Sequence, residues 1–227
     1  MRSVSVLCRG ARSLASRMRR ALIIALALVA SACSSGDRPT LQEPVPPPTD
    51  PTGNDDIDAV LALLDSVDTA LFTADYRIET KFGTLESSAT VVRASGGRLS
   101  VTVRNDSRDI QFTIDGLDQT TCDLRSNTCD AELNNARISD TQLGYQFYAP
   151  AFAARLRADA IRRIGDPEGY TAEFAGEPAQ CVDVVVSGGT KTYCALETGP
   201  LAHFVGADVA VEVTGYSPDP DLTVFDT

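Results

Sequence analysis

Residues 98–114 read RLSVTVRNDSRDIQFTI, and this stretch decides the class of fold. Apolar side chains occupy every second position of two short runs, which are Leu99, Val101 and Val103, and then Ile110, Phe112 and Ile114. A period of two is typical of antiparallel strands that bury one face and expose the other. Gly96–Gly97 before the stretch and Asp115–Gly116 after it suit turns. The stretch therefore predicts antiparallel strands with one buried face.

The same alternation recurs on both sides of this stretch. It is present in Tyr76, Ile78, Thr80 and Phe82, and again in Val209, Val211 and Val213. Along the whole chain, such segments number about nine to eleven. At about 4.8 Å between neighbouring strands, ten of them would form a sheet roughly 48 Å wide.

Two segments show helical periodicity instead. The apolar stripes are Ile57, Val60, Leu61, Leu64, Val67 and Leu71 in the first, and Phe152, Leu156, Ala160 and Ile164 in the second. Asn54 suits the cap of the first helix, Pro150 suits the first turn of the second, and Gly165 can end it. Four arginines lie largely off the second stripe and are interpreted as a solvated face, with a patch for anionic lipids as the alternative: Arg155, Arg157, Arg162 and Arg163.

The N-terminal residues 1–32 form a predicted signal peptide. They contain six arginines and no acidic residue, and the last arginine precedes an unbroken apolar run, residues 21–30. This order of basic, apolar and then small residues is that of a secretory signal. The apolar run is too short to span a bilayer as a helix, which takes about 20 residues.

The residues that follow the apolar run make the signal more specific. Residues 29–33 read VASAC and resemble a bacterial lipobox. The resemblance implies that residues 1–32 are removed and that Cys33 carries acyl chains. Such an anchor would hold the protein on the extracytoplasmic face of the cell membrane or envelope. The alternative is an ordinary signal cut after Ala32, which would leave Cys33 without lipid.

The mature chain divides into a tether and one domain. Residues 33–54 hold the lipidated Cys33 and a proline-rich segment, with six of the chain's twelve prolines in residues 37–52. Proline-rich chains favour the extended polyproline II conformation rather than helix or sheet. Residues 55–227 then contain all the periodic segments, which predicts a single folded domain beyond a tether.

Four cysteines remain for the domain after Cys8 and Cys33 are set aside. An even number in an exported chain indicates disulfides. Three pairings are possible, and the spacing favours the local ones, Cys122–Cys129 and Cys181–Cys194, each across a hairpin-like segment. A zinc site would need two closely spaced pairs, and neither spacing fits.

Charge and motifs narrow the possible functions. Residues 33–227 contain 14 basic and 31 acidic residues, a net charge of −17, which argues against nucleic-acid binding. The only histidine is His203, and the chain has no nucleophile elbow, phosphate loop or metalloprotease motif. We therefore expect a protein that is not an enzyme and that needs no cofactor or metal.

The order of segments resembles a known family. A lipobox, a tether, a helix, strands, a second helix and closing strands are similar to the LolA-like carriers, especially actinobacterial lipoproteins of the LppX and LprG type. The C-terminal sequence segments that carry the resemblance are residues 181–184, 192–201 and 207–216. The resemblance implies an α+β fold in which a curved antiparallel sheet, a half-barrel, wraps around two main helices and encloses an apolar cavity for acyl chains.

These observations predict a monomeric, membrane-anchored lipoprotein that binds or carries a lipid or another hydrophobic ligand. Two helices, each about 10 Å wide, cover less than half of the expected sheet, so the remaining apolar face must curl, pack or line a cavity. The residues expected to face this cavity are Tyr76, Ile78, Phe82, Val101, Val103, Phe112 and Ile114. The alternative is a non-catalytic envelope scaffold without a small ligand, whose solid core would hide the same residues.

Overall fold

A computed structural model describes residues 51–81, 85–137 and 143–226. The predicted signal peptide, Cys33 and most of the predicted tether lie outside the described residues, as does Phe82. Residues 49–227 form one compact unit, which contains the strands, α-helices, disulfides and hydrophobic core of the described residues. A compact unit with a hydrophobic core of its own can fold as an independent domain. Among the described residues, no helix combines the length and apolar character needed to cross a bilayer.

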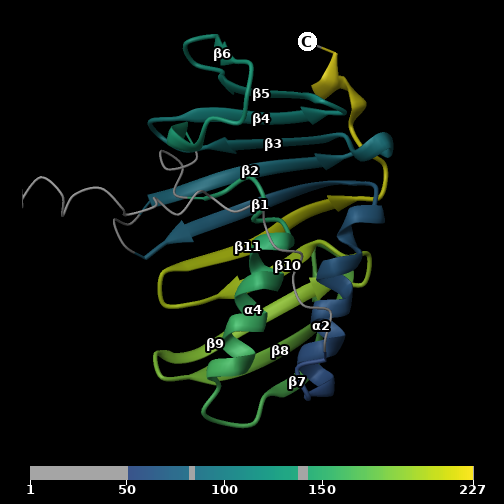
Figure 1. Cartoon of the computed structure of the whole chain (residues 1–227), viewed down its shortest axis with the longest axis vertical. Helices are drawn as coiled ribbons and strands as arrows, with labels where there is room; N and C mark the ends of the chain where they lie inside the picture. Colours follow the sequence, from purple (N-terminus) through teal and green to yellow (C-terminus); the bar gives the residue numbers. More distant parts are fainter. Residues whose placement is uncertain (1–50, 82–84, 138–142, 227) are drawn as a thin grey trace, which may run out of the picture. The chain divides into compact units, whose positions relative to one another are not determined.

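One antiparallel sheet dominates the fold, and it has eleven strands within the described residues (Figure 1). The strands are β1 (Phe72–Thr80), β2 (Leu85–Arg93), β3 (Leu99–Arg104), β4 (Asp109–Asp115), β5 (Asp118–Asp123), β6 (Thr128–Asp130), β7 (Glu168–Phe174), β8 (Glu177–Val186), β9 (Gly189–Leu196), β10 (Leu201–Val205) and β11 (Val209–Ser217). Their order is β6-β5-β4-β3-β2-β1-β11-β10-β9-β8-β7. Two meanders therefore meet where the first strand pairs with the last, which places Ile78 opposite Val211.

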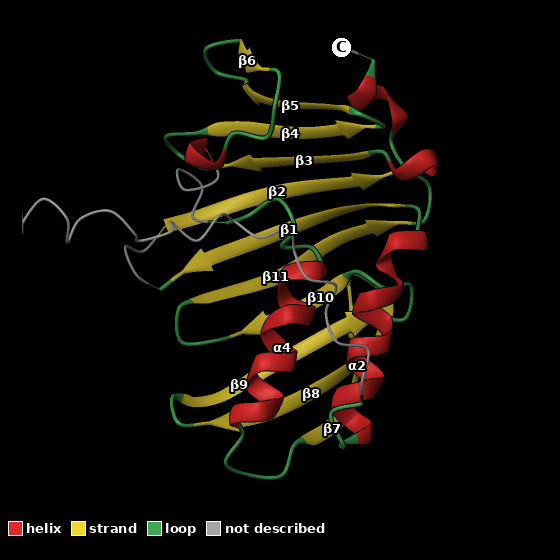
Figure 2. Ribbon diagram, viewed as in Figure 1, coloured by secondary structure: helices red, strands yellow, loops and turns green. Residues whose placement is uncertain are grey.

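Two α-helices pack on one face of the sheet (Figure 2), and the expected α+β class is confirmed. They are α2 (Asp55–Ser66) and α4 (Pro150–Arg162), and both cover the half of the sheet that contains β8. The side chain of Asn54 caps α2 by accepting a hydrogen bond of 3.0 Å from the backbone of Ile57. Short 3-10 turns occupy Val67–Thr69, Ser95–Gly97 and Leu222–Phe225.

Both helices end earlier than the apolar stripes predicted, so the expected burial of Leu71 and Ile164 is wrong. Leu71 follows the 3-10 turn that ends α2 and is exposed. Arg163 leaves the helical conformation, and the backbone N–H of Ile164 donates to Val185 in β8. Ile164 is consequently 69% exposed. In both cases the chain must turn to reach the next strand, which overrides the local helical pattern.

An irregular segment, residues 143–149, fills the concave face beyond the helices. Its Phe147 ring meets Tyr76 of β1 edge-on at 5.1 Å, and its Tyr145 ring lies 6.3 Å from Phe112 of β4. Tyr148 lies 6.2 Å from Phe72 at the start of β1. Much of the apolar face that two helices leave uncovered is therefore packed against aromatic side chains.

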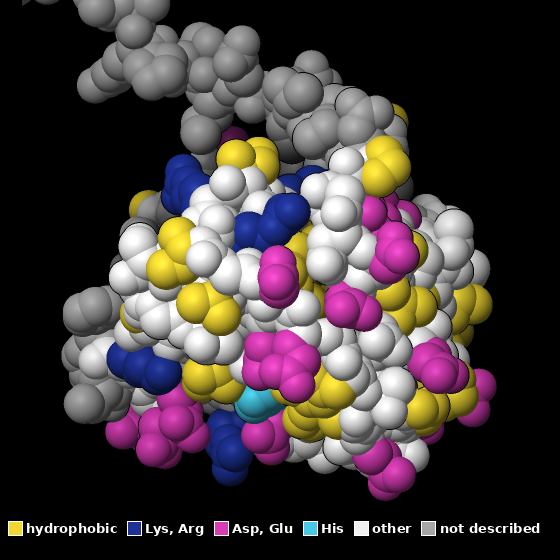
Figure 3. Space-filling model, turned by 90° about the horizontal axis from the view of Figure 1, so that it is seen from below, with side chains coloured by type: hydrophobic (Ala, Val, Ile, Leu, Met, Phe, Trp, Pro, Cys, Tyr) yellow, Lys and Arg dark blue, Asp and Glu magenta, His cyan; other side chains and the backbone are white. Residues whose placement is uncertain are grey.

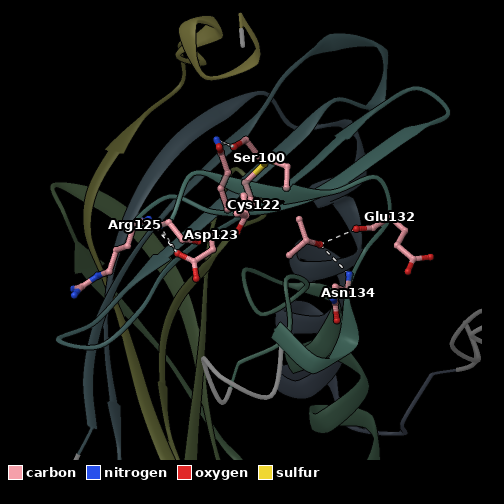
Figure 4. Close-up of a disulfide and its surroundings, with 11 residues drawn as sticks. Ser100, Cys122, Asp123, Arg125, Glu132 and Asn134 are labelled. Atoms are coloured by element: carbon pink, nitrogen blue, oxygen red, sulfur yellow. Dashed lines mark hydrogen bonds between the residues drawn. A yellow bond between two sulfur atoms is a disulfide. The ribbon is translucent and has the colours of Figure 1, made fainter.

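Both cysteine pairs are joined locally. Cys181 of β8 lies directly opposite Cys194 of β9, because the loop between these strands has only two residues. Both of these cysteines are fully buried. Cys122 of β5 is joined to Cys129 of β6 at the sheet edge, where the side chain of Asp123 accepts hydrogen bonds from the turn that follows it (Figure 4). The two disulfides thus lie in very different surroundings, one inside the sheet and one at its edge.

Candidate ligand-binding cleft

The residues expected to line a cavity lie on the concave side of the sheet. Tyr76, Ile78, Val101, Val103 and Phe112 are buried in the core, and Ile114 is partly buried against it. Two of them, Tyr76 and Phe112, contact aromatic rings of the segment 143–149. None of the six lines the cleft described next, and Phe82 lies outside the described residues.

A cleft of about 310 Å³ opens where the N-terminal half of α4 meets the C-terminal end of β1 and the start of β11. Its apolar walls come from five side chains on three parts of the chain, which are Leu143 and Phe147 before α4, Ala151 and Phe152 in α4, and Val209 in β11. The complete lining is Thr80, Leu143, Gly144, Phe147, Ala151, Phe152, Arg155, Asp208 and Val209. The amphipathic pattern of α4 explains this placement, because Ala151, Phe152 and Arg155 share one side of the helix.

An ion pair forms the polar part of the lining. The two terminal nitrogens of Arg155 donate to the two carboxylate oxygens of Asp208, at 3.0 and 2.5 Å. The guanidinium also lies over the ring of Phe204, 4.6 Å from its centre. The hydrogen bond from Arg155 holds the pKa of Asp208 below its usual value, against the opposing effect of desolvation. The side chain of Arg155 is 28% exposed and that of Asp208 is 46% exposed.

A buried polar cluster fixes α4 one helical turn further on. Asp159 is only 4% exposed and accepts hydrogen bonds from Lys191 at 2.7 and 2.8 Å and from the hydroxyl of Tyr193. Burial, followed by the hydrogen bond to Asp159, raises the pKa of Tyr193, so this hydroxyl remains a donor. The cluster therefore ties α4 to β9 through charged and neutral hydrogen bonds.

The single histidine does not line this cleft, and Figure 3 shows it at the surface beside acidic side chains. His203 alternates along β10 with Phe204, which faces α4, so the histidine faces the opposite side of the sheet. Its ring stacks on Phe174 at 5.2 Å, and burial lowers its pKa. Within the described ranges, no group of three or more His, Cys, Asp or Glu side chains could hold a metal ion. The charged groups that line the cleft are one ion pair, Arg155 and Asp208.

The sequence contained little sign of this cleft. Arg155 was interpreted as part of a solvated face, whereas the structure pairs it with Asp208, 53 positions further along the chain. Arg157 likewise pairs with Asp65 of α2. The one available signal was that the arginines lie off the apolar stripe, and this cannot reveal a partner so distant in sequence.

Comparisons with known proteins add a structural likeness only. The class that the fold defines is an open antiparallel sheet with two helices on one face. No family model and no curated protein sequence matches the chain. Among solved structures, it is similar to the crystal structure of MucB, with a TM-score of 0.44 and 11% identity over 76% of this chain and 62% of that one.

Two structures of complexes are similar to the same extent. MucB in complex with MucA(peri) has a TM-score of 0.45 and 11% identity, and the match covers 75% of this chain and 59% of that one. The MucA/MucB complex of Pseudomonas aeruginosa has a TM-score of 0.45 and 12% identity, over 76% and 61%. This chain therefore spans less than two thirds of each of these three chains.

Proposed function

We propose that this protein is a lipoprotein of the cell envelope, anchored in the membrane through Cys33, whose domain binds a lipid or another hydrophobic ligand without catalysing a reaction. The observation that carries the proposal is the cleft beside α4, which combines apolar walls with one charged pair. Small-molecule sites are typically clefts of this kind, mostly apolar with few polar groups.

The disulfides support an extracytoplasmic location. Two disulfides within one medium-sized domain are typical of proteins that fold in an oxidising compartment. The signal sequence and the lipobox-like residues at Cys33 agree with this, and they suggest that the domain stays near the membrane. The net charge of −17 in residues 33–227 would keep the domain soluble and limit its contact with anionic lipid surfaces.

The size of the cleft suggests a small occupant. At about 310 Å³ it lies at the lower end of the range of ligand sites, about 300–1,000 Å³. Leu143, Phe147, Phe152 and Val209 provide apolar surface that a hydrocarbon chain would cover. One chain suits this volume better than the two or three chains of a complex lipid, and its burial would provide the driving force for binding.

A scaffold without a small ligand is the second candidate, and the packing of the concave face favours it. The contacts of Phe147 with Tyr76 and of Tyr145 with Phe112 fill space that a larger cavity would need. In a scaffold, the cleft would be a surface depression, and the domain would act through its outer surface.

Ligand binding separates the two candidates. Residues 49–227 are purified, examined by native mass spectrometry and organic extraction, and then titrated with a fluorescent fatty acid. The Ala151→Trp variant places an indole in the cleft and is expected to weaken uptake by about tenfold or more, which corresponds to 1.4 kcal/mol. Ala154→Trp, on an exposed part of the same helix outside the cleft lining, is the matched control and should bind like the original domain. If the domain has its bare sequence mass and takes up no ligand, the ligand-binding function is excluded and the scaffold function remains.

A further inference from the structure

The arginine in the cleft is arranged to hold a carboxylate. Arg155 binds Asp208 with both terminal nitrogens, one to each carboxylate oxygen, which is the fork geometry that guanidinium groups form with carboxylates. Its flat face lies over Phe204, which limits the directions in which the fork can point. Because both partners line the cleft, the fork is directed at a carboxylate that already lies in the cleft wall.

The present partner of Arg155 is easy to replace. The side chain of Asp208 is 46% exposed, and backbone N–H groups of Asp208 and Val209 also bond its carboxylate. The carboxylate therefore keeps hydration and partners of its own when another anion takes its place on Arg155. The backbone of Asp208 stays in place, because its carbonyl accepts a 2.8 Å hydrogen bond from the N–H of Lys81. Arg155 is less exposed than Asp208, and its guanidinium lies against the ring of Phe204, so it is held more tightly.

The charge balance of the region also favours an anionic group in this position. The buried Asp159 pairs with Lys191 and also acts on Arg155 through its charge. Asp208 is the anion that bonds Arg155 directly, and a partly buried guanidinium that loses its bonded anion is left poorly compensated. A ligand that displaces Asp208 must bring a negative charge of its own, and a planar carboxylate reproduces the existing geometry.

We infer that the cleft binds a single-chain carboxylic acid, whose carboxylate takes the place of Asp208 on Arg155 while its chain covers Phe147, Phe152 and Val209. The inference rests on the proposed function and specifies the class of ligand at the same site. Asp208 then acts as an internal competitor that occupies Arg155 when the cleft is empty.

The test compares decanoate with decanol, two ligands of equal chain length that differ in the head group. Residues 49–227 are titrated with each by calorimetry at low salt, and decanoate is expected to bind at least about tenfold more tightly, as a charge-assisted hydrogen bond predicts. Arg155→Gln should remove this preference, and Arg155→Lys, which keeps the charge without the fork, should retain only part of it. Asp208→Asn should raise the ratio of decanoate affinity to decanol affinity about fivefold or more, because the competitor for Arg155 is lost.

The outcomes separate the inference from the function on which it rests. If neither ligand binds, the proposed function fails. If both bind equally, or if Asp208→Asn does not raise the ratio of the two affinities, the ligand-binding function stands and the carboxylate assignment is refuted. Decyl phosphate is the third probe, and tighter binding of it than of decanoate would also overturn the assignment. Thermal unfolding of each variant checks that the domain remains folded.

Discussion

The carboxylate of Asp159 in α4 is buried and accepts hydrogen bonds from two residues of β9, so we expect Asp159→Ala to destabilise the domain severely. The substitution leaves Lys191 and the hydroxyl of Tyr193 without their shared acceptor. Removing one partner of a buried ion pair costs about 3–5 kcal/mol. The side chain of Lys191 is 17% exposed and regains some hydration, which places the expected loss near the lower end, about 3 kcal/mol. With a slope of about 2 kcal/mol/M, the urea midpoint should fall by about 1.5 M.

The assay is urea unfolding of residues 49–227, followed by circular dichroism. Glu79→Ala is the control, because it removes an ion pair with Arg77 in which both side chains are more than half exposed, and it should cost less than about 1 kcal/mol. The double variant Asp159→Ala/Lys191→Ala should lose clearly less than the sum of the single losses, since the uncompensated charge is gone. A loss below about 1 kcal/mol for Asp159→Ala, or strict additivity, would refute the reasoning.

Three further predictions concern the anchor, the disulfides and the histidine. Cys33→Ala should move the protein from the membrane fraction to the soluble fraction, and unchanged retention would contradict the lipoprotein assignment. Mild reduction followed by alkylation should label the edge pair Cys122–Cys129 before the buried pair Cys181–Cys194. Loss of the buried pair in the Cys181→Ser/Cys194→Ser variant should lower the free energy of unfolding in urea by about 2–3 kcal/mol. Burial lowers the pKa of His203 in the folded domain, so the unfolded chain takes up the proton first as the pH falls. The free energy of unfolding should therefore decline from about pH 6.5 towards pH 5. The decline should be smaller in His203→Gln.

Local patterns were enough to predict much of the sheet. The alternation in residues 98–114 corresponds to β3 and β4, which pair with Val101 opposite Phe112. The opposition of Cys181 and Cys194 followed from a two-residue loop, because a tight hairpin sets the register of its strands. These features depend on residues within about a dozen positions of one another, so the chain encodes them locally.

The sequence was a poorer guide to where the helices end and to which side chains cover the concave face. Ile164 continues the apolar stripe of α4, yet it is exposed because its backbone bonds to Val185. The area argument anticipated an uncovered apolar face but not that Phe147 and its neighbours would cover it. An irregular segment has no periodicity, and its packing is set by the shape of the space it enters.

The sequence alone predicted the α+β class, about the right number of strands and the positions of α2 and α4, and it favoured the local pairing of the cysteines. Only the tertiary structure decided that β1 pairs with β11 and that Arg155 meets Asp208, contacts between segments far apart in the chain. The physical reason is that periodicity reports which face of an element is buried but not what buries it. The partner depends on the summed packing and charge of the whole domain, and the candidate cleft lies where three such distant segments meet.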